Sequence, residues 1–207
     1  MQTNVLICLQ FPRGTTDSEL AGTAGTNQTP SRPLLPCPLL YPVHLFKLAR
    51  INSEIKYVTQ SISRDTPAYA YPPVRGIYRW QQDVVRSVED WFSTIPQQDD
   101  DGYDWIARVC KRYHEIMVFL LRPSPGVPSP SDQSIDLCFH HAVELLRDFG
   151  VLYRSGYLLY SRLVVHSILV GTLVMLHCIW KVPAVAANCR LDELAVVFNT
   201  SQNIFEQ

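Results

Sequence analysis

A proline-rich interruption near the middle of the chain constrains the fold more than any other feature of the sequence. Residues Tyr113–Pro130 read YHEIMVFLLRPSPGVPSP, which is an apolar helical pattern followed by closely spaced prolines. Each proline lacks a backbone donor and pushes the residue before it out of the α region, so the helix must end there. We expect the spacer to run extended, close to polyproline II. Long helical patterns lie on both sides of it, so the spacer decides how two halves of a helical core meet.

Three amphipathic helices are predicted before the spacer, because apolar residues recur at steps of three and four. The first runs from Leu45 to about Ile62 and the second from about Ile77 to Thr94, while Asp101 or Asp104 is available to cap the third. The three apolar stripes are Leu48, Ile51, Ile55, Val58 and Ile62; Trp80, Val84, Val88, Trp91 and Ile95; and Ile106, Val109, Tyr113, Ile116, Met117 and Leu120.

A fourth helix is predicted directly after the spacer. Ser129 is the expected N-cap, with Pro130 at the first helical position and Asp132 completing an S-x-x-D box. Gly150 is the expected C-cap. The core stripe of this helix is Ile135, Cys138, Ala142, Leu145, Leu146 and Phe149. A less regular helix is expected near the end of the chain, from Leu191 to Phe205.

Residues 157–180 are the most hydrophobic run of the chain and are long enough to cross a membrane. However, Arg162, His166 and His177 fall on roughly one side of this run, and a charged arginine at membrane depth is costly. Its flanks also lack a clear Lys/Arg asymmetry. We therefore predict an all-α fold, an irregular multi-helix bundle around a central apolar helix at about residues 157–180. A single membrane span through the same residues is the alternative.

The first 43 residues differ from the rest of the chain. They show no sustained periodicity and contain six of the 15 prolines together with Gly/Thr runs. This composition is typical of a disordered or non-domain leader. We therefore divide the chain into a leader, residues 1–43, and one helical domain, residues 44–207.

The composition of the chain restricts its environment and its partners. Hydrophobic residues make up 47% and charged residues 18%, which is typical of a globular chain. The formal net charge of −1 gives no basic field for nucleic acid, so we expect no direct DNA binding. The six cysteines are scattered without a Cys-x-x-Cys pair, which favours a reducing intracellular compartment.

The search for chemistry finds only weak signals. His114-Glu115 begins like a zinc-protease helix, but Val118 stands where the second histidine belongs. The pairs Cys110/His114 and Cys138/His141 have the spacing of metal ligands on a helix and leave a metal-dependent helical enzyme as a minor hypothesis. Core packing explains them better, so we predict no enzyme, no catalytic residue, no bound metal and no cofactor.

Three polar residues on the apolar run are the remaining site candidates. Arg162, His166 and His177 would lie inside a helical core if residues 157–180 are its central helix. Polar groups in a core need partners. They are therefore predicted to line a pocket for a small effector, or to be satisfied by hydrogen bonds within the protein.

Several short segments form an ordered set along the helical part of the chain. They are Leu48–Ile55, Tyr113-His114, Leu120–Pro125 with Pro128, Cys138 with Ala142, His166, Gly171-Thr172-Leu173 and Leu176–Trp180. Taken together, these segments resemble the regulatory (middle homology) domain of fungal Zn2Cys6 transcription factors over roughly residues 44–205. Leu121 departs from the pattern, since the family often has Tyr there.

The resemblance implies a non-enzymatic role in transcription regulation in the nucleus. It implies contacts with other transcription factors or co-regulator proteins, or with a small effector. The family's DNA reader is a six-cysteine cluster that holds two zinc ions, and the cysteine separations of this chain cannot build it. Zinc is therefore expected only in a missing DNA-binding module, and the domain itself is expected to be incomplete.

Overall fold

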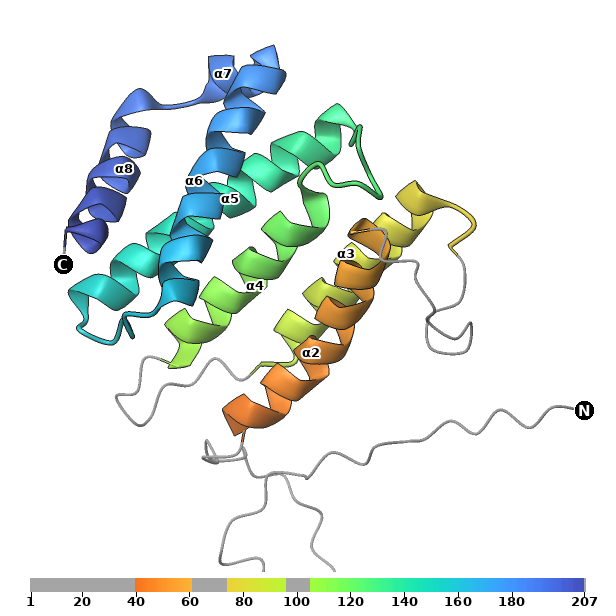
Figure 1. Cartoon of the computed structure of the whole chain (residues 1–207), viewed down its shortest axis with the longest axis horizontal. Helices are drawn as coiled ribbons and strands as arrows, with labels where there is room; N and C mark the ends of the chain where they lie inside the picture. Colours follow the sequence, from red (N-terminus) through yellow and green to blue (C-terminus); the bar gives the residue numbers. More distant parts are fainter. Residues whose placement is uncertain (1–39, 61–73, 96–104, 207) are drawn as a thin grey trace, which may run out of the picture.

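The computed structural model describes residues 40–60, 74–95 and 105–206, and all regular secondary structure in these ranges is helical (Figure 1). The all-α, multi-helix fold predicted from the sequence is confirmed. The helices are α2 (Leu40–Thr59), α3 (Ile77–Ser93), α4 (Trp105–Leu121), α5 (Asp132–Arg154), α6 (Arg162–Lys181), α7 (Pro183–Asn188) and α8 (Leu191–Phe205).

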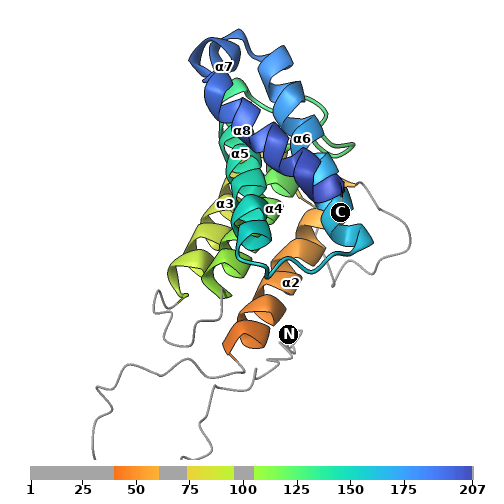
Figure 2. The same cartoon turned by 90° about the vertical axis from the view of Figure 1, so that its left-hand side faces the viewer.

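Helix α5 occupies the centre of the bundle. It packs against α4 on one side and against α6 and α8 on the other, while α2 and α3 pack beside α4 (Figures 1 and 2). The reason lies in its sequence, because apolar residues cover more than one side of this helix. The buried residues of α5 are Ile135, Cys138, His141, Ala142, Val143, Leu145, Leu146, Phe149, Gly150 and Leu152.

The apolar run predicted as the central helix takes a different place. Its helical part, α6, begins after Ser161, whose hydroxyl accepts a hydrogen bond from the Val164 backbone N–H at 3.3 Å. The inner face of α6 packs on α5, whereas its outer face is open to solvent. Residues 157–180 therefore form a side of the bundle, and α5 forms its centre.

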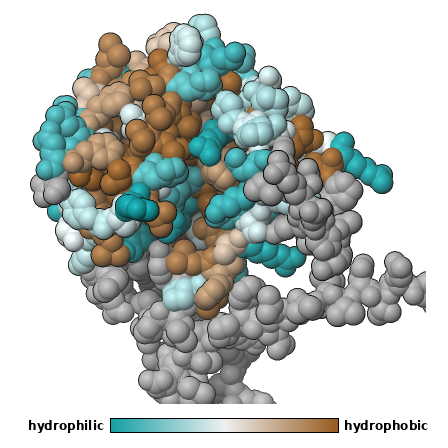
Figure 3. Space-filling view, in the orientation of Figure 1, coloured by the Kyte–Doolittle hydropathy of each residue, from teal (hydrophilic) through white to brown (hydrophobic). Residues whose placement is uncertain are grey.

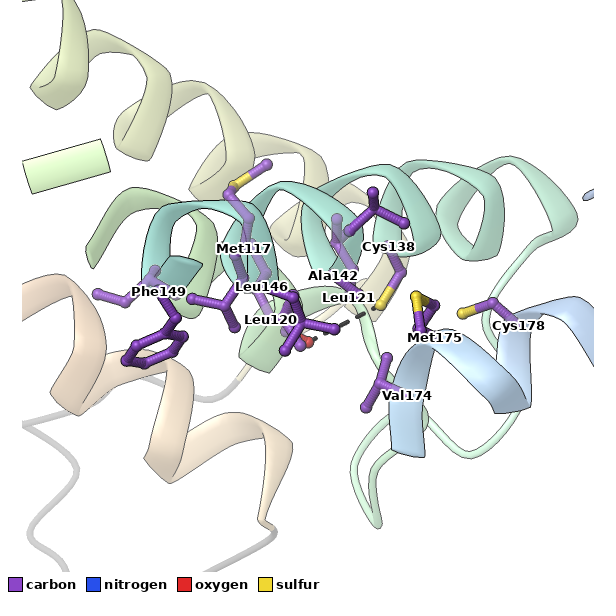
Figure 4. Packing of buried hydrophobic residues seen from close by; sticks show 14 of the residues in the cluster. Met117, Leu120, Leu121, Cys138, Ala142, Leu146, Phe149, Val174, Met175 and Cys178 are labelled. Carbon is purple, nitrogen blue, oxygen red and sulfur yellow. Dashed lines mark hydrogen bonds between the residues drawn. The ribbon is translucent and has the colours of Figure 1, made fainter. Parts of the chain in front are cut away.

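The predicted apolar stripes of α4 and α5 make the core (Figure 4). Met117, Leu120 and Phe149 are fully buried. Gly171 brings α6 close to this layer, since a Cβ there would lie 3.3 Å from Leu146 Cδ2. Burying one large apolar side chain stabilises a fold by about 1.5–3 kcal/mol, so this interface holds the bundle together.

Side-chain hydrogen bonds to backbone carbonyls tie α2, α3 and α4 to one another. Trp91 Nε1 of α3 donates to the His44 carbonyl of α2 at 3.0 Å, and buried Gln81 Nε2 of α3 donates to the Leu120 carbonyl of α4 at 2.9 Å. The second bond satisfies a carbonyl in the last turn of α4, which has no partner within its own helix. The three helices are thus fixed in register.

The proline-rich spacer is a tight reversal and does not run extended as predicted. Ser124 and Val127 exchange two backbone hydrogen bonds, of 3.1 and 3.0 Å, around Pro125-Gly126. The Gly126 N–H then donates to the Thr59 carbonyl at the end of α2, at 2.8 Å. A Pro-Gly pair is a common turn centre, and this turn also satisfies a terminal carbonyl of α2.

The ends of α5 differ from the prediction. The N-cap is Ser131, whose Oγ accepts from the Ser134 N–H at 3.2 Å, and the predicted cap Ser129 lies outside the helix. The predicted C-cap Gly150 is inside the helix, where a Cβ would lie 2.9 Å from Thr200 Cγ2 of α8. This glycine therefore gives room for α8. The left-handed glycine after the helix is Gly156, with φ 75°.

Some predictions lie outside the described residues. These are the capping roles of Asp101 and Asp104, the stripe residue Ile62 and residues 1–39 of the predicted leader. Helix α2 begins at Leu40, so helical structure starts a few residues before the predicted boundary after residue 43. Short helix α7 was not predicted, whereas α8 agrees with the predicted bounds.

Candidate functional site

The three side chains predicted to line an effector pocket do not meet around one cavity. Arg162 and His166 lie one turn apart on the exposed side of α6, while His177 is half-buried further along the helix. At 1.5 Å per residue, His166 and His177 are roughly 16 Å apart along the axis. Of the three, His166 lines a groove, and it does so from the edge.

That groove has a volume of about 540 Å³ and lies where α2 and α6 pack on either side of α4. This volume is within the range of small-molecule sites. Its lining combines an apolar floor with several charged side chains. The lining residues are Leu45, Leu48, Ala49, Asn52, Lys56, Arg112, Glu115, Ile116, Val118, Phe119, Arg122, Leu145, Leu163, His166, Ser167 and Val170.

Glu115 is a charged but locally neutralised group at one end of the groove. Its carboxylate accepts hydrogen bonds from Arg112 Nη1 at 2.7 Å and from the Ser167 hydroxyl, and Lys111 Nζ lies 3.8 Å away. Burial alone would raise the pKa of Glu115, but Lys111, Arg112 and these hydrogen bonds hold it below the ordinary value. The carboxylate and its cations therefore leave no net negative charge for a ligand.

The opposite end of the groove carries positive charge. Arg122 lies with its guanidinium 4.8 Å from the centre of the Phe119 ring, and burial lowers its pKa from the ordinary value. Its buried Nε has no hydrogen-bond partner among the described residues. Lys56 of α2 lines the same groove, and no described carboxylate lies within 4.0 Å of either cation. This end therefore suits an anionic group on an otherwise apolar ligand.

A pair of histidines links α4 and α5 beside the core. His114 Nδ1 and His141 Nδ1 are 2.8 Å apart, and the Tyr113 ring packs edge-on against both. Burial lowers the pKa of His114 to about 4 and that of His141 to about 3. Both rings are thus neutral at pH 7, and one nitrogen donates to the other.

Asp148 stands next to this pair and is also perturbed. Its Oδ2 lies 3.9 Å from His114 Nε2, and burial, followed by the charge of Glu144, raises its pKa to about 7. Oδ2 has no hydrogen-bond partner among the described side chains and backbone groups. Asp148 therefore changes its charge near neutral pH beside two neutral histidines.

Two cysteines meet in the core between α5 and α6. The hydrogen bond between Cys138 and Cys178, together with burial, raises the pKa of the Cys138 thiol. Both are free thiols, and the Cys138 Sγ lies 3.9 Å from the Val118 carbonyl (Figure 4). They pack as small apolar residues, which agrees with their predicted places on apolar faces.

The proposed metal-ligand pairs do not combine into a site. The fold joins His114 to His141, whereas Cys138 faces Cys178. Among the described residues, no group of three or more Cys, His, Asp or Glu side chains is placed to hold a metal ion. The sequence contained a signal for the histidine contact, because His114 and His141 are almost equally distant from the spacer of an antiparallel hairpin.

The outer face of α6 is the other unusual surface. Apolar residues gather over this part of the molecule in the space-filling view (Figure 3). Of the helices in the described ranges, α6 alone is long and apolar enough to cross a membrane. Its most apolar 18-residue stretch has a mean hydropathy of 2.0, and 28% of that stretch is buried in the bundle. Core helices of soluble proteins can be as long and as apolar, but such helices are mostly buried.

Comparison of the chain with protein-family models, with curated proteins and with solved structures finds no match.

Proposed function

We propose that this chain is the regulatory domain of a fungal-specific zinc-cluster-type transcription factor, without the DNA-binding cluster. The observation that carries the proposal is the ordered set of sequence segments that resemble this family. Those segments belong to the helical core described above: Leu48–Ile55 is in α2, Tyr113–Pro125 includes the end of α4 and its reversal, and Cys138 with Ala142 is in α5.

In this proposal the chain is not an enzyme and acts in the nucleus. It regulates transcription through contacts with other transcription factors or co-regulators, or through a small effector, and it does not touch DNA itself. Zinc belongs to the DNA-binding module of such factors and not to this chain. The net charge of −1 supports a role that needs no direct contact with nucleic acid.

The groove between α2, α4 and α6 is the proposed effector site. It joins three helices from both sides of the spacer, so a ligand there would couple the α2–α3 pair to the α5–α6 side of the bundle. Lys56 and Arg122 supply positive charge, and Leu48, Ile116 and Val170 supply an apolar surface. Of the three residues predicted to line an effector pocket, His166 is the one that lines this groove.

A reporter assay tests this function. The full chain is fused to a foreign DNA-binding module, and transcription is measured over a range of growth conditions. We expect the fused chain to change reporter output with growth condition. Ala49→Trp, which fills the groove, should make the output the same under all conditions. Ala195→Trp makes the same substitution on exposed α8 and serves as the matched control. No effect of the fused chain under any condition would overturn the proposal.

The second candidate is a membrane-anchored helical protein, and the exposure of α6 is the observation that favours it. Against it, the inner face of α6 is packed on α5 through Ile168, Met175 and Cys178, so a spanning helix would have to leave the bundle. Alkaline carbonate extraction separates the two functions. We expect release of the chain into the soluble fraction, whereas retention with membranes would favour the anchor.

A further inference from the structure

The outer face of α6 exposes large apolar side chains along the whole helix. Trp180 is 88% exposed and Leu163 is 77% exposed, although tryptophan and leucine side chains are usually largely buried. The exposed apolar residues of α6 are Leu163, Val165, Leu169, Leu173, Leu176 and Trp180. Leu169, Leu173, Leu176 and Trp180 share one side of the helix, and an exposed apolar surface of this kind marks an interaction site.

The spacing of this face identifies the shape of the partner. Six of its exposed residues recur at alternating steps of four and three over 19 residues, which is the spacing with which one helix packs against another in a coiled coil. In order, the seam residues are Arg162, His166, Leu169, Leu173, Leu176 and Trp180. Ile168, Gly171 and Met175 occupy other positions of the repeat and pack inward, so the seam is free of the chain's own core.

The seam is complementary to itself in one orientation. If two copies pack antiparallel about an axis near Gly171, Leu169 meets Leu173 of the other copy, and the Arg162 guanidinium meets the Trp180 ring. An arginine over an indole face is a favourable cation–π contact. A parallel arrangement would place Arg162 against Arg162 and leave Trp180 without this cation. The Arg162–Trp180 contact therefore favours the antiparallel register.

The exposed apolar area of the face is a large part of what a stable dimer buries. From the exposed fractions of Val165, Leu169, Leu173, Leu176 and Trp180, and about 200 Å² for a fully exposed large apolar residue, this face offers roughly 550 Å². Each partner of a standard stable interface buries about 800 Å². Arg162 and His166, which are also exposed on this side of α6, add to the area.

We propose that a second copy of this chain docks on the outer face of α6, with the two α6 helices antiparallel. The proposal rests on the geometry of α6 and does not depend on the proposed function, although His166 lies at the border of both surfaces. It assigns Leu169 and Leu173 to the centre of the interface, and Arg162 and Trp180 to its two ends. A lipid surface is the competing occupant, and the experiment below distinguishes the two.

Sedimentation velocity of the full chain over a range of micromolar concentrations gives the first test. We expect a monomer–dimer equilibrium that Leu173→Glu shifts at least tenfold towards monomer. Leu191→Glu places the same charge on an exposed leucine of α8 and should leave the equilibrium unchanged. Circular dichroism of both variants checks that they fold. A wild-type chain that stays monomeric, or a dimer insensitive to Leu173→Glu, would overturn the proposal.

Cysteine cross-linking tests the register. A mixture of Arg162→Cys and Trp180→Cys chains should form a mixed disulfide dimer under mild oxidation, whereas each variant alone should give no more dimer than the wild type with its native cysteines. Strong cross-linking of Arg162→Cys with itself would indicate a parallel pair and contradict the proposal. So would cosedimentation of the wild-type chain with phosphatidylcholine vesicles in place of self-association.

Discussion

The α4–spacer–α5 hairpin and helix α6 are both strongly apolar, yet they use their apolar residues in opposite ways. In the hairpin the large side chains, such as Leu120 and Phe149, are buried, and Gly126 closes the turn against α2. In α6 the inner face is buried while Leu173 and Trp180 remain in solvent. The hairpin thus contributes stability to the fold, whereas the outer face of α6 carries the proposed contact with a second copy.

The largest expected effect compares one substitution in both regions. Leu120→Ala should lower the free energy of unfolding by about 2–5 kcal/mol, because it empties a fully buried site. Leu173→Ala should change it by less than about 0.5 kcal/mol at submicromolar concentration, because dilution favours the monomer. Urea unfolding measures both. Equal losses at the two sites would contradict the assignment of Leu173 to a free surface.

A pH-dependent effect sharpens the description of the hairpin. Burial raises the pKa of Asp148 to about 7, above its ordinary value of 3.8. The native chain therefore keeps a proton that the unfolded chain releases, and this contribution to stability is lost as the pH rises from about 4 to about 7. Relative to wild type, Asp148→Asn should gain about 2–3 kcal/mol between pH 5 and pH 8.

Unfolding of the wild type and of Asp148→Asn at both pH values measures this gain. The opposite contributions of His114 and His141 are present in both proteins, so the difference reports Asp148 together with its contact with His114. Asp136→Asn changes an exposed aspartate of the same helix and is the control. A constant difference between Asp148→Asn and wild type across this pH range would rule out a perturbed carboxyl at the hairpin.

The turn of the hairpin offers a smaller test. In Gly126→Ala the new Cβ would lie 2.2 Å from the Val58 carbonyl oxygen, so the spacer or the end of α2 must move. We expect a loss of about 1–3 kcal/mol in thermal or urea unfolding. Gly76→Ala, whose Cβ would meet Arg79 Cβ at 3.9 Å, should cost less. If Gly76→Ala costs as much, the docking of the spacer on α2 is wrong.

The smallest expected effect concerns the start of α5. Ser131→Ala removes the N-cap hydrogen bond to the Ser134 N–H and should cost about 1 kcal/mol. Ser129→Ala removes a hydroxyl outside the helix and should be close to neutral. Chemical denaturation of the two variants decides which serine caps the helix, and a larger loss for Ser129→Ala would restore the assignment made from sequence.

Much of the hairpin was predictable from sequence because its signals are periodic. The stripe Ile135 to Phe149 alternates with polar residues, so its buried side was clear. The cap was not, because Ser129 and Ser131 each precede a plausible first turn, and Pro130 fits between them in both cases. The tight turn at Pro125-Gly126 depends on a contact with Thr59, which no local pattern contains.

The environment of α6 was harder to predict for a physical reason. Its sequence is apolar on nearly all sides, so periodicity cannot separate the face that meets α5 from the face that meets solvent. The exposure of the candidate site residues on α6 was hard to predict for the same reason. A central position of residues 157–180 predicts interior places for Arg162, His166 and His177, whereas the position of α6 at the side of the bundle leaves Arg162 and His166 exposed.

Hydroxyl-radical footprinting of the wild-type chain over a range of concentrations tests the central claim most directly, because it needs no substitution. Trp180 on α6 and Tyr78 on α3 are both exposed aromatic side chains. If the outer face of α6 receives a second copy, oxidation of Trp180 falls as the concentration rises, while oxidation of Tyr78 stays constant. An oxidation rate of Trp180 that is the same at all concentrations would contradict the account.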